Sequence, residues 1–152
     1  MPFNTGIALP TPIAEHPLAE RVPTRKAMGL RRQHRLIKER VVALLSDGAR
    51  LTRQEFVIRL GENDCGQGRL AIAVPKRILK RAVDRNRVKR VIKEAFRQHP
   101  VRTAPVDMLV TMHHQAATQA GDPNALKHQR QQLRATLMHL FSDILRRFGV
   151  AA

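Results

Sequence analysis

Apolar residues recur at a helical spacing over residues 82–97, AVDRNRVKRVIKEAFR. Counted from residue 88, they fall at i, i+3, i+4, i+7 and i+8, which places them on one face of an α-helix. These positions are Val88, Val91, Ile92, Ala95 and Phe96. The pattern predicts a helix whose apolar face packs into a core and whose other faces are dominated by cations.

A second helical pattern covers residues 30–46 near the N-terminal side of the chain. Its apolar stripe consists of Leu36, Ile37, Val41, Leu44 and Leu45. Asp47-Gly48 follows at a typical helix end, where glycine takes the left-handed conformation. We therefore expect the first helix to span residues 30–46 and to end at Gly48.

Strand patterns lie between and after these helices. Alternation over residues 49–60 predicts one or two strands, and short apolar runs at 70–74 and 106–112 predict two more. The glycine-rich residues 61–68 form a connection, and they precede a strand rather than a helix, which excludes a phosphate-cradling loop. These segments predict a small sheet.

A final helix begins around residues 121–123, with proline near its first turn. Its predicted inward residues are Leu126, Leu133, Leu137, Leu140, Phe141, Ile144 and Leu145. The order α-β-β-β-α-β-α predicts an α+β fold, a two-layer α/β sandwich around a four-stranded sheet.

Residues 1–28 differ from the rest of the chain because they contain five of the nine prolines and show no periodicity. Such a segment buries too little apolar surface to offset the entropy of ordering. We expect a disordered extension at 1–28 and one domain at 29–150. A start codon placed too far upstream would give the same pattern, with Met28 as an alternative start.

The net charge of the chain limits which classes of partner it could bind. Lys and Arg number 28 against 12 Asp and Glu, a net charge of +16, and residues 69–97 hold 11 of these cations against Asp84 and Glu94. A solvated charged surface is the alternative, but such surfaces usually intersperse both signs. A block of one sign indicates a nucleic-acid partner. No segment is apolar enough to predict a membrane anchor.

Candidate catalytic groups are sparse. The seven histidines form no HExxH motif, and the carboxylates show no spacing that predicts a catalytic pair or a metal site. Cys65 is the only cysteine, which excludes an intrachain disulfide and fits a reducing compartment. We expect no catalytic residue and no metal ligand on this chain, and a cytoplasmic location, since prolines interrupt any export signal.

The segment RNRVKRVIKEAFR closely resembles the signature of the bacterial ribonuclease P protein subunit. The resemblance rests on Arg85-Asn86, Lys89-Arg90, Lys93-Glu94 and Phe96-Arg97, and it extends back through LAIAVPKRILKRAV. It implies an α+β sandwich with a left-handed βαβ crossover. It also implies an accessory role: a large RNA hydrolyses the phosphodiester with Mg²⁺ and releases the 5′ leader of precursor tRNA.

The resemblance implies two sets of contacts with RNA. The RNA-binding residues would be Lys76, Arg77, Lys80, Arg81, Arg85, Asn86, Arg87, Lys89, Arg90, Lys93 and Arg97. A cleft between the sheet and the first helix would receive the single-stranded leader through Val41, Leu45, Arg50 and Phe56. The sequence leaves open whether Phe56 stacks on a base or lies in the core.

The implied partners are ribonuclease P RNA and precursor tRNA, with no membrane and no required protein partner. The protein would bind no cofactor tightly, and Mg²⁺ would belong to the RNA subunit. The alternative is a non-catalytic basic RNA-binding protein of the ribosomal or RNA-chaperone type. A DNA-binding regulator is disfavoured because no helix-turn-helix pair surrounds the basic helix.

Overall fold

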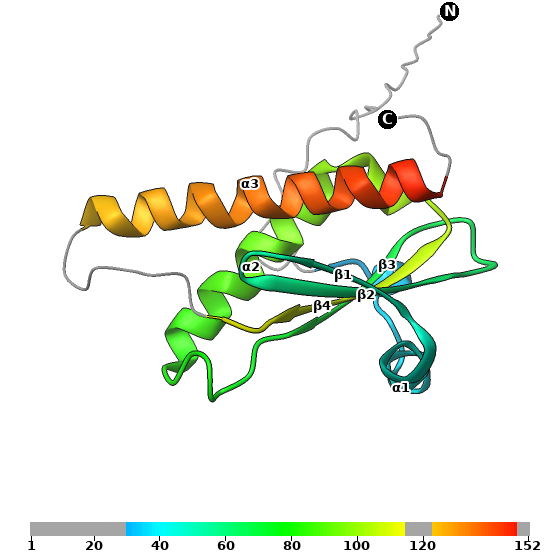
Figure 1. The fold of residues 1–152 in the computed structure, drawn as a ribbon, viewed down its shortest axis with the longest axis horizontal. Helices are drawn as coiled ribbons and strands as arrows, with labels where there is room; N and C mark the ends of the chain where they lie inside the picture. Colours follow the sequence, from blue (N-terminus) through cyan, green and yellow to red (C-terminus); the bar gives the residue numbers. More distant parts are fainter. Residues whose placement is uncertain (1–29, 115–122, 149–152) are drawn as a thin grey trace, which may run out of the picture.

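The computed structural model describes residues 30–114 and 123–148, and its centre is a four-stranded mixed sheet (Figure 1). The strands are β1 (Ala49–Arg53), β2 (Phe56–Glu62), β3 (Arg69–Ala73) and β4 (Val106–Met112), arranged in the spatial order β1-β2-β4-β3. β2 pairs antiparallel with both β1 and β4, whereas β3 and β4 are parallel.

Within the described residues, three α-helices accompany the sheet: α1 (Lys38–Asp47), α2 (Ala82–Gln98) and α3 (Pro123–Arg147). The short 3₁₀ segment η2 (Arg32–His34) precedes α1, and another, η3 (Pro100–Thr103), follows α2. The predicted α+β fold and its element order are confirmed. The predicted extension, residues 1–28, lies outside the described residues.

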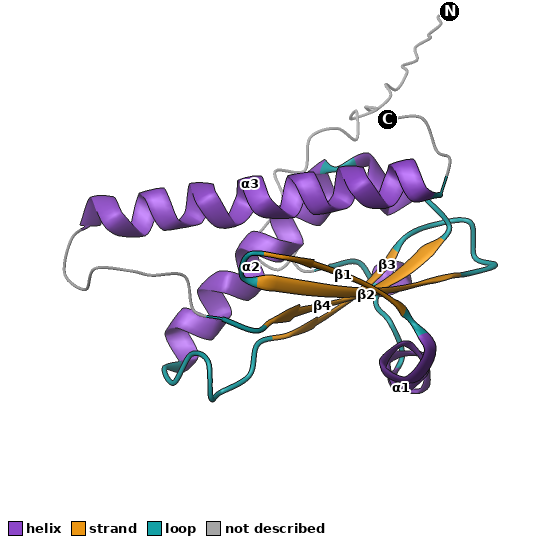
Figure 2. Cartoon of the chain, in the orientation of Figure 1, coloured by secondary structure: helices purple, strands orange, loops and turns teal. Residues whose placement is uncertain are grey.

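The two faces of the sheet are covered differently. Helices α2 and α3 lie on one face, and α1 lies on the opposite face at one end of the strands (Figure 2). Along β2, Phe56, Ile58 and Leu60 belong to the core shared with α2 and α3. Their neighbours in the alternation point the other way, toward α1. We call this second side the α1 face.

The core forms where the sequence predicts it on α2. All five residues of its predicted apolar stripe are buried. Phe96 meets Phe141 of α3 edge to face, with ring centroids 6.3 Å apart. Past the end of α2, the buried ring of His99 accepts a hydrogen bond from the Val101 amide at Nδ1, and burial lowers the pKa of this histidine. Apolar and aromatic side chains thus hold α2 against the sheet and against α3.

The prediction for the first helix is wrong at its start, whereas its end is confirmed within one residue, since α1 ends at Asp47 with Gly48 as its C-cap; only the predicted left-handed conformation of that glycine is wrong. The helix begins at Lys38, because Arg35 forms a parallel bridge with Leu70 and the Leu36 amide donates to the Leu70 carbonyl. At the other end Gly48 has a φ of −66°, so it is not left-handed. Glycine fits there because a Cβ would lie 2.5 Å from the Leu44 carbonyl oxygen.

One inward residue of the last helix is also predicted wrongly. Leu126 is 38% exposed, and the first buried residue of α3 is Leu133. The other predicted positions, Leu133, Leu137, Leu140, Phe141, Ile144 and Leu145, are all buried. The N-terminal part of α3 therefore continues past the core that its second half covers.

Candidate nucleic-acid interface

The outer face of α2 carries a stripe of cations. At 100° per residue, positions i, i+4, i+7 and i+11 share one face of a helix. Counted from residue 86, these are Asn86, Arg90, Lys93 and Arg97, which lie opposite the buried apolar stripe. Lys89 borders them on one side. We call these five residues the α2 stripe, a surface that contains no acid.

The segment between β3 and α2 adds four more cations. The Pro75 carbonyl accepts hydrogen bonds from the amides of Ile78 and Leu79, which folds the segment into a turn. Leu79 is buried, and Ile78 packs against the core. The cations Lys76, Arg77, Lys80 and Arg81 remain exposed. We call residues 75–81 the basic loop, and its apolar anchors hold its charges beside the start of α2.

Arg85 connects the basic loop to α2. Its Nη1 donates to the carbonyl oxygens of Leu79 and Lys80 at 2.9 and 2.7 Å. Arginine provides several donors in a fixed plane, so one guanidinium can hold a loop and still present N–H groups elsewhere. Arg85 therefore fixes the shape of the predicted RNA-binding surface, in addition to contributing charge.

Arg87 lies on a different side of α2 from the stripe. Its Nη1 is 3.2 Å from Asp84 Oδ1, an i,i+3 ion pair in which both side chains are about one-third exposed. The pair partly balances the charge of Arg87 and places an acid in the first turn of the helix, where the helix dipole favours it. The cations predicted to bind RNA thus differ in how much of their charge is already balanced by a neighbouring acid.

Three of the four predicted leader residues lie on the α1 face or on α1 itself. Arg50 of β1 pairs in register with Arg59 of β2, and the Arg59 guanidinium donates to the Leu45 carbonyl at the end of α1. Leu45 is 51% exposed, and Val41 is half-buried one turn earlier. These side chains border the same side of the sheet.

Phe56 does not join them. Its ring is 0% exposed and belongs to the core between the sheet and helices α2 and α3. Strand alternation therefore puts Val57, not Phe56, on the α1 face. Phe56 therefore does not line a cleft beside α1: of the two alternatives that the sequence left open, the structure has the ring in the core. Among the described residues, Phe96 and Phe141 are also buried and Phe148 packs on the same core.

The α1 face contains a buried ionic cluster that the sequence analysis missed. Asp107 of β4 is 0% exposed. Its carboxylate accepts from Arg40 Nε of α1 at 2.6 Å, from Arg69 of β3 at 2.7 and 2.9 Å, and from Asn63 at 2.8 Å. We call these four residues the Asp107 cluster. The available signal was one acid inside the apolar run VDMLVTM, because buried carboxylates require partners.

The partners keep Asp107 ionised. Burial alone raises the pKa of this carboxyl, but the hydrogen bonds from Arg69, Asn63 and Arg40 outweigh it and hold the pKa below its ordinary value. The hydrogen bond to Asp107 correspondingly raises the pKa of Arg69. The cluster therefore remains an ion pair network at neutral pH, and it joins α1 to two strands.

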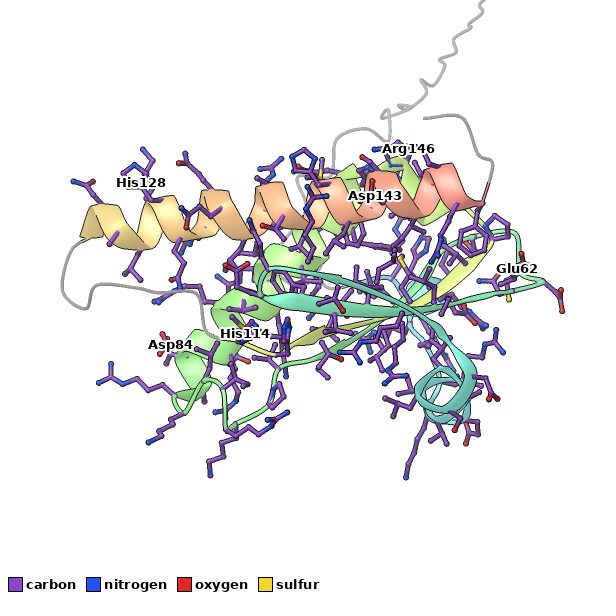
Figure 3. The ribbon with its side chains drawn as sticks, viewed as in Figure 1. Glu62, Asp84, His114, His128, Asp143 and Arg146 are labelled. Atoms are coloured by element: carbon purple, nitrogen blue, oxygen red, sulfur yellow. The ribbon has the colours of Figure 1, made fainter. Side chains whose placement is uncertain are left out.

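The start of α2, beside the basic loop, and the Asp107 cluster lie toward opposite ends of the sheet. Asp84, in the first turn of α2, and Glu62, at the end of β2, lie far apart at opposite ends of the molecule (Figure 3). β3 connects these ends, since it begins at Arg69 in the Asp107 cluster and leads into the basic loop. The α1 face therefore extends from α1 toward the basic loop.

Metal-binding and membrane-spanning features are absent from the part of the chain that the structure describes. Within residues 30–114 and 123–148, no group of three or more His, Cys, Asp or Glu side chains could hold a metal ion. No helix in the same ranges is long and apolar enough to cross a bilayer.

Comparison with known proteins identifies the family. The model of the Ribonuclease P family matches residues 30–144, which is most of the chain. The chain belongs to the ribonuclease P protein family. It is 39% identical over 83 residues to the ribonuclease P protein component of Thioalkalivibrio sulfidiphilus, a match that covers 54% of this chain and 69% of that protein. With the component of Halorhodospira halophila it shares 48% identity over 48 residues, 32% of this chain and 39% of the relative.

A solved structure supports the same assignment. A mutant of the Staphylococcus aureus RNase P protein superposes with a TM-score of 0.58 at 25% identity, over 73% of this chain and 87% of that one. The α+β architecture with a four-stranded mixed sheet is therefore that of the family. The left hand of the β3-α2-β4 crossover stays a prediction from the resemblance.

Proposed function

We propose that this chain is the protein subunit of ribonuclease P, which binds the catalytic RNA and assists removal of the 5′ leader from precursor tRNA. The observation that carries the proposal is the placement of the family signature. Its apolar residues are buried in the core, and four of its cations lie on the α2 stripe beside the exposed basic loop. A surface of one charge sign on a firmly packed helix fits an RNA backbone.

In this proposal the α2 stripe and the basic loop contact ribonuclease P RNA. The contacts would be phosphate contacts, which position a protein on RNA without reading its sequence. The N-terminus of α2 adds the positive end of the helix dipole, and its N-cap residue Arg81 makes no side-chain capping hydrogen bond. Bound phosphate would stabilise the cations that crowd this helix start.

The 5′ leader would lie along the α1 face. This surface, which we call the leader surface, comprises Val41 and Leu45 of α1, Arg50 and Arg59 at the β1–β2 pair, and Val57. It joins the basic loop through β3, so a strand leaving the catalytic RNA would meet both regions. Because no described phenylalanine lies on this face, the leader would be held by arginines and aliphatic side chains rather than by stacking on a phenylalanine ring.

The chemistry would belong to the RNA subunit, with Mg²⁺ held there and no cofactor held tightly by the protein. The protein's part is electrostatic and positional: its cations offset the repulsion between two RNAs, and the leader surface holds the substrate strand. A cytoplasmic location, where tRNA precursors are made, and no requirement for a further protein subunit complete the proposal.

Reconstitution with a bacterial ribonuclease P RNA tests it. At low Mg²⁺, where RNA–RNA repulsion is least screened, the protein should stimulate cleavage of precursor tRNA and favour substrate with a leader over mature tRNA. Absence of stimulation would contradict the proposal. Equal binding of both tRNAs in the presence of the RNA subunit would favour a non-catalytic RNA-binding protein.

A further inference from the structure

Helix α1 is attached to the sheet by one buried apolar side chain and a small set of directional hydrogen bonds. Only Leu44 among its ten residues is buried, and Leu44 is not part of the core cluster that includes α2 and α3. The remaining attachments are the hydrogen bonds from Arg40 to Asp107 and to the Glu62 carbonyl, and the hydrogen bond from Arg59 to the Leu45 carbonyl. The position of α1 therefore depends on a few directional bonds.

Asp107 is held in place mainly by residues outside α1. Gly61, Asp107 and Arg69 stand opposite one another in register on β2, β4 and β3. Arg69 and Asn63 together make three of the four hydrogen bonds to the carboxylate, and both residues are outside α1. The sheet thus presents a preset acceptor, and Arg40 is the only donor to Asp107 that α1 provides among the described residues.

The Arg40–Asp107 bond also determines where the leader-surface residues of α1 lie. Arg40 and Leu44 are one turn apart and face the sheet, while Val41 and Leu45 follow them by one residue, about 100° around the helix. A rotation or shift of α1 about the Arg40–Asp107 bond therefore moves Val41 and Leu45 relative to the strands.

We propose that Asp107, acting through Arg40, is a positioning residue for the 5′ leader, because it sets where the α1 side of the leader surface stands. The inference rests on the proposed function, since the leader is the ligand that reports the position of α1. It assigns no contact with RNA to Asp107, which is inaccessible to solvent.

The first test replaces the α1 end of the bond. Arg40→Gln removes the donor and leaves Asp107 paired with Arg69 and Asn63, so the sheet keeps its buried ion pair. The matched control is Arg53→Gln, which removes the same charge from an Arg53–Asp143 pair at 3.3 Å that links β1 to α3. The two variants have equal net charge, and only one of them touches α1.

Two measurements separate positioning from general stability. Amide hydrogen exchange should become faster in α1 of Arg40→Gln, with β2 and β4 unchanged, whereas Arg53→Gln should match the wild type. In the reconstituted holoenzyme, the affinity ratio of precursor tRNA to mature tRNA should fall about threefold to tenfold for Arg40→Gln alone, the size of effect expected from a repositioned element.

A second variant shifts α1 without changing any charge. A Cβ on Gly61 would lie 3.0 Å from Leu44 Cδ2 and 3.2 Å from Arg40 Nη2, so both side chains must move by a few tenths of an ångström. Gly61→Ala should therefore lower the same affinity ratio, by a smaller factor than Arg40→Gln. Because Gly61→Ala keeps the Arg40 guanidinium, a lowered ratio in this variant cannot come from loss of that group or its charge.

The outcomes distinguish the two proposals. If wild-type holoenzyme shows no preference for the leader, the proposed leader role fails, and exchange in α1 still decides whether the Asp107 cluster anchors that helix. If the wild type prefers the leader but Arg40→Gln and Gly61→Ala keep the full ratio, the positioning role of Asp107 is overturned. Unchanged exchange in α1 of Arg40→Gln would overturn it as well.

Discussion

Helices α2 and α1 both pack on the sheet, but different forces hold them. α2 buries Val88, Val91, Ile92, Ala95 and Phe96. Burial of a large apolar side chain contributes about 1.5–3 kcal/mol relative to exposure, so this face alone secures the helix. α1 buries only Leu44 and depends on hydrogen bonds to Asp107 and from Arg59. The proposed RNA-binding helix is thus part of the core, and the helix beside the leader surface is an attachment to it.

This difference explains how the chain can bear so many like charges. An apolar face that is already buried leaves the outer side of α2 free to carry cations, because packing and charge occupy opposite sides of one helix. On α1 the polar residue Arg40 is itself the anchor. Hydrogen bonds are steeply dependent on distance and angle, so α1 is placed accurately with little buried surface.

The largest expected effect comes from the shared core. Phe56→Ala should lower the free energy of unfolding by about 3–5 kcal/mol, because it leaves a cavity under α2 and α3. Urea unfolding followed by far-UV circular dichroism measures this, since the chain has no Trp and no Tyr. Val42→Ala, at a 55% exposed position on α1, is the control and should change the stability by less than about 0.5 kcal/mol. Normal stability with lost leader affinity in Phe56→Ala would instead place the ring on the leader surface.

A smaller effect is expected at the Asp107 cluster, and it depends on pH. Asp107→Asn should cost about 1.5–3 kcal/mol at pH 7, since the amide cannot replace a charged acceptor facing two arginines. The folded-state pKa of Asp107 lies below its ordinary value of 3.8. Its contribution is therefore fully present above that value and is lost as the pH falls through the lower folded-state pKa.

Urea unfolding between pH 6 and pH 2 measures this dependence. The wild type and Asp107→Asn should differ most at the upper end of the range and converge at the lower end. If the difference in unfolding free energy between the two proteins stayed the same down to pH 2, the Asp107 cluster would stabilise the fold through packing and not through the charge of Asp107.

The same contrast explains what the sequence could predict. The apolar stripe of α2 recurs at helical spacing from Val88 to Phe96, so periodicity alone identified every buried residue of the helix. β4 was predicted with the bounds that the structure has, Val106–Met112, because it is a short apolar run between a proline and a polar tract. Elements that bury a continuous apolar face can therefore be predicted from the local pattern of apolar residues.

The features around α1 carried no such signal. The partners of Asp107 lie 38, 44 and 67 positions away in the sequence, so no local pattern could bring them together. Residues 30–37 continue the helical stripe, but pairing of Arg35 with Leu70 overrides that preference. Alternation in β2 showed which residues share a face, but not which face α1 covers, so the sequence could not decide whether Phe56 lies in the leader cleft or in the core.

The smallest effect on stability, and the sharpest test of the comparison, is expected on the outer face of α2. Arg90 is exposed on the α2 stripe, opposite the packed face, so Arg90→Gln should leave the urea midpoint within about 0.5 kcal/mol of the wild type. If Arg90 contacts a phosphate, the salt dependence of the affinity for ribonuclease P RNA should lose about one unit of slope.

Arg87→Gln is the matched control, because it removes the same charge from the same helix. Arg87 is already paired with Asp84, so its substitution should reduce the slope by less than that of Arg90. Equal salt-dependence slopes for both variants and the wild type would mean that the cations on the outer face of α2 are exposed to solvent and do not contact RNA phosphates. A loss of stability in Arg90→Gln comparable to that of Asp107→Asn would mean that α2, like α1, is held by its charges, and the contrast between the two helices would not stand.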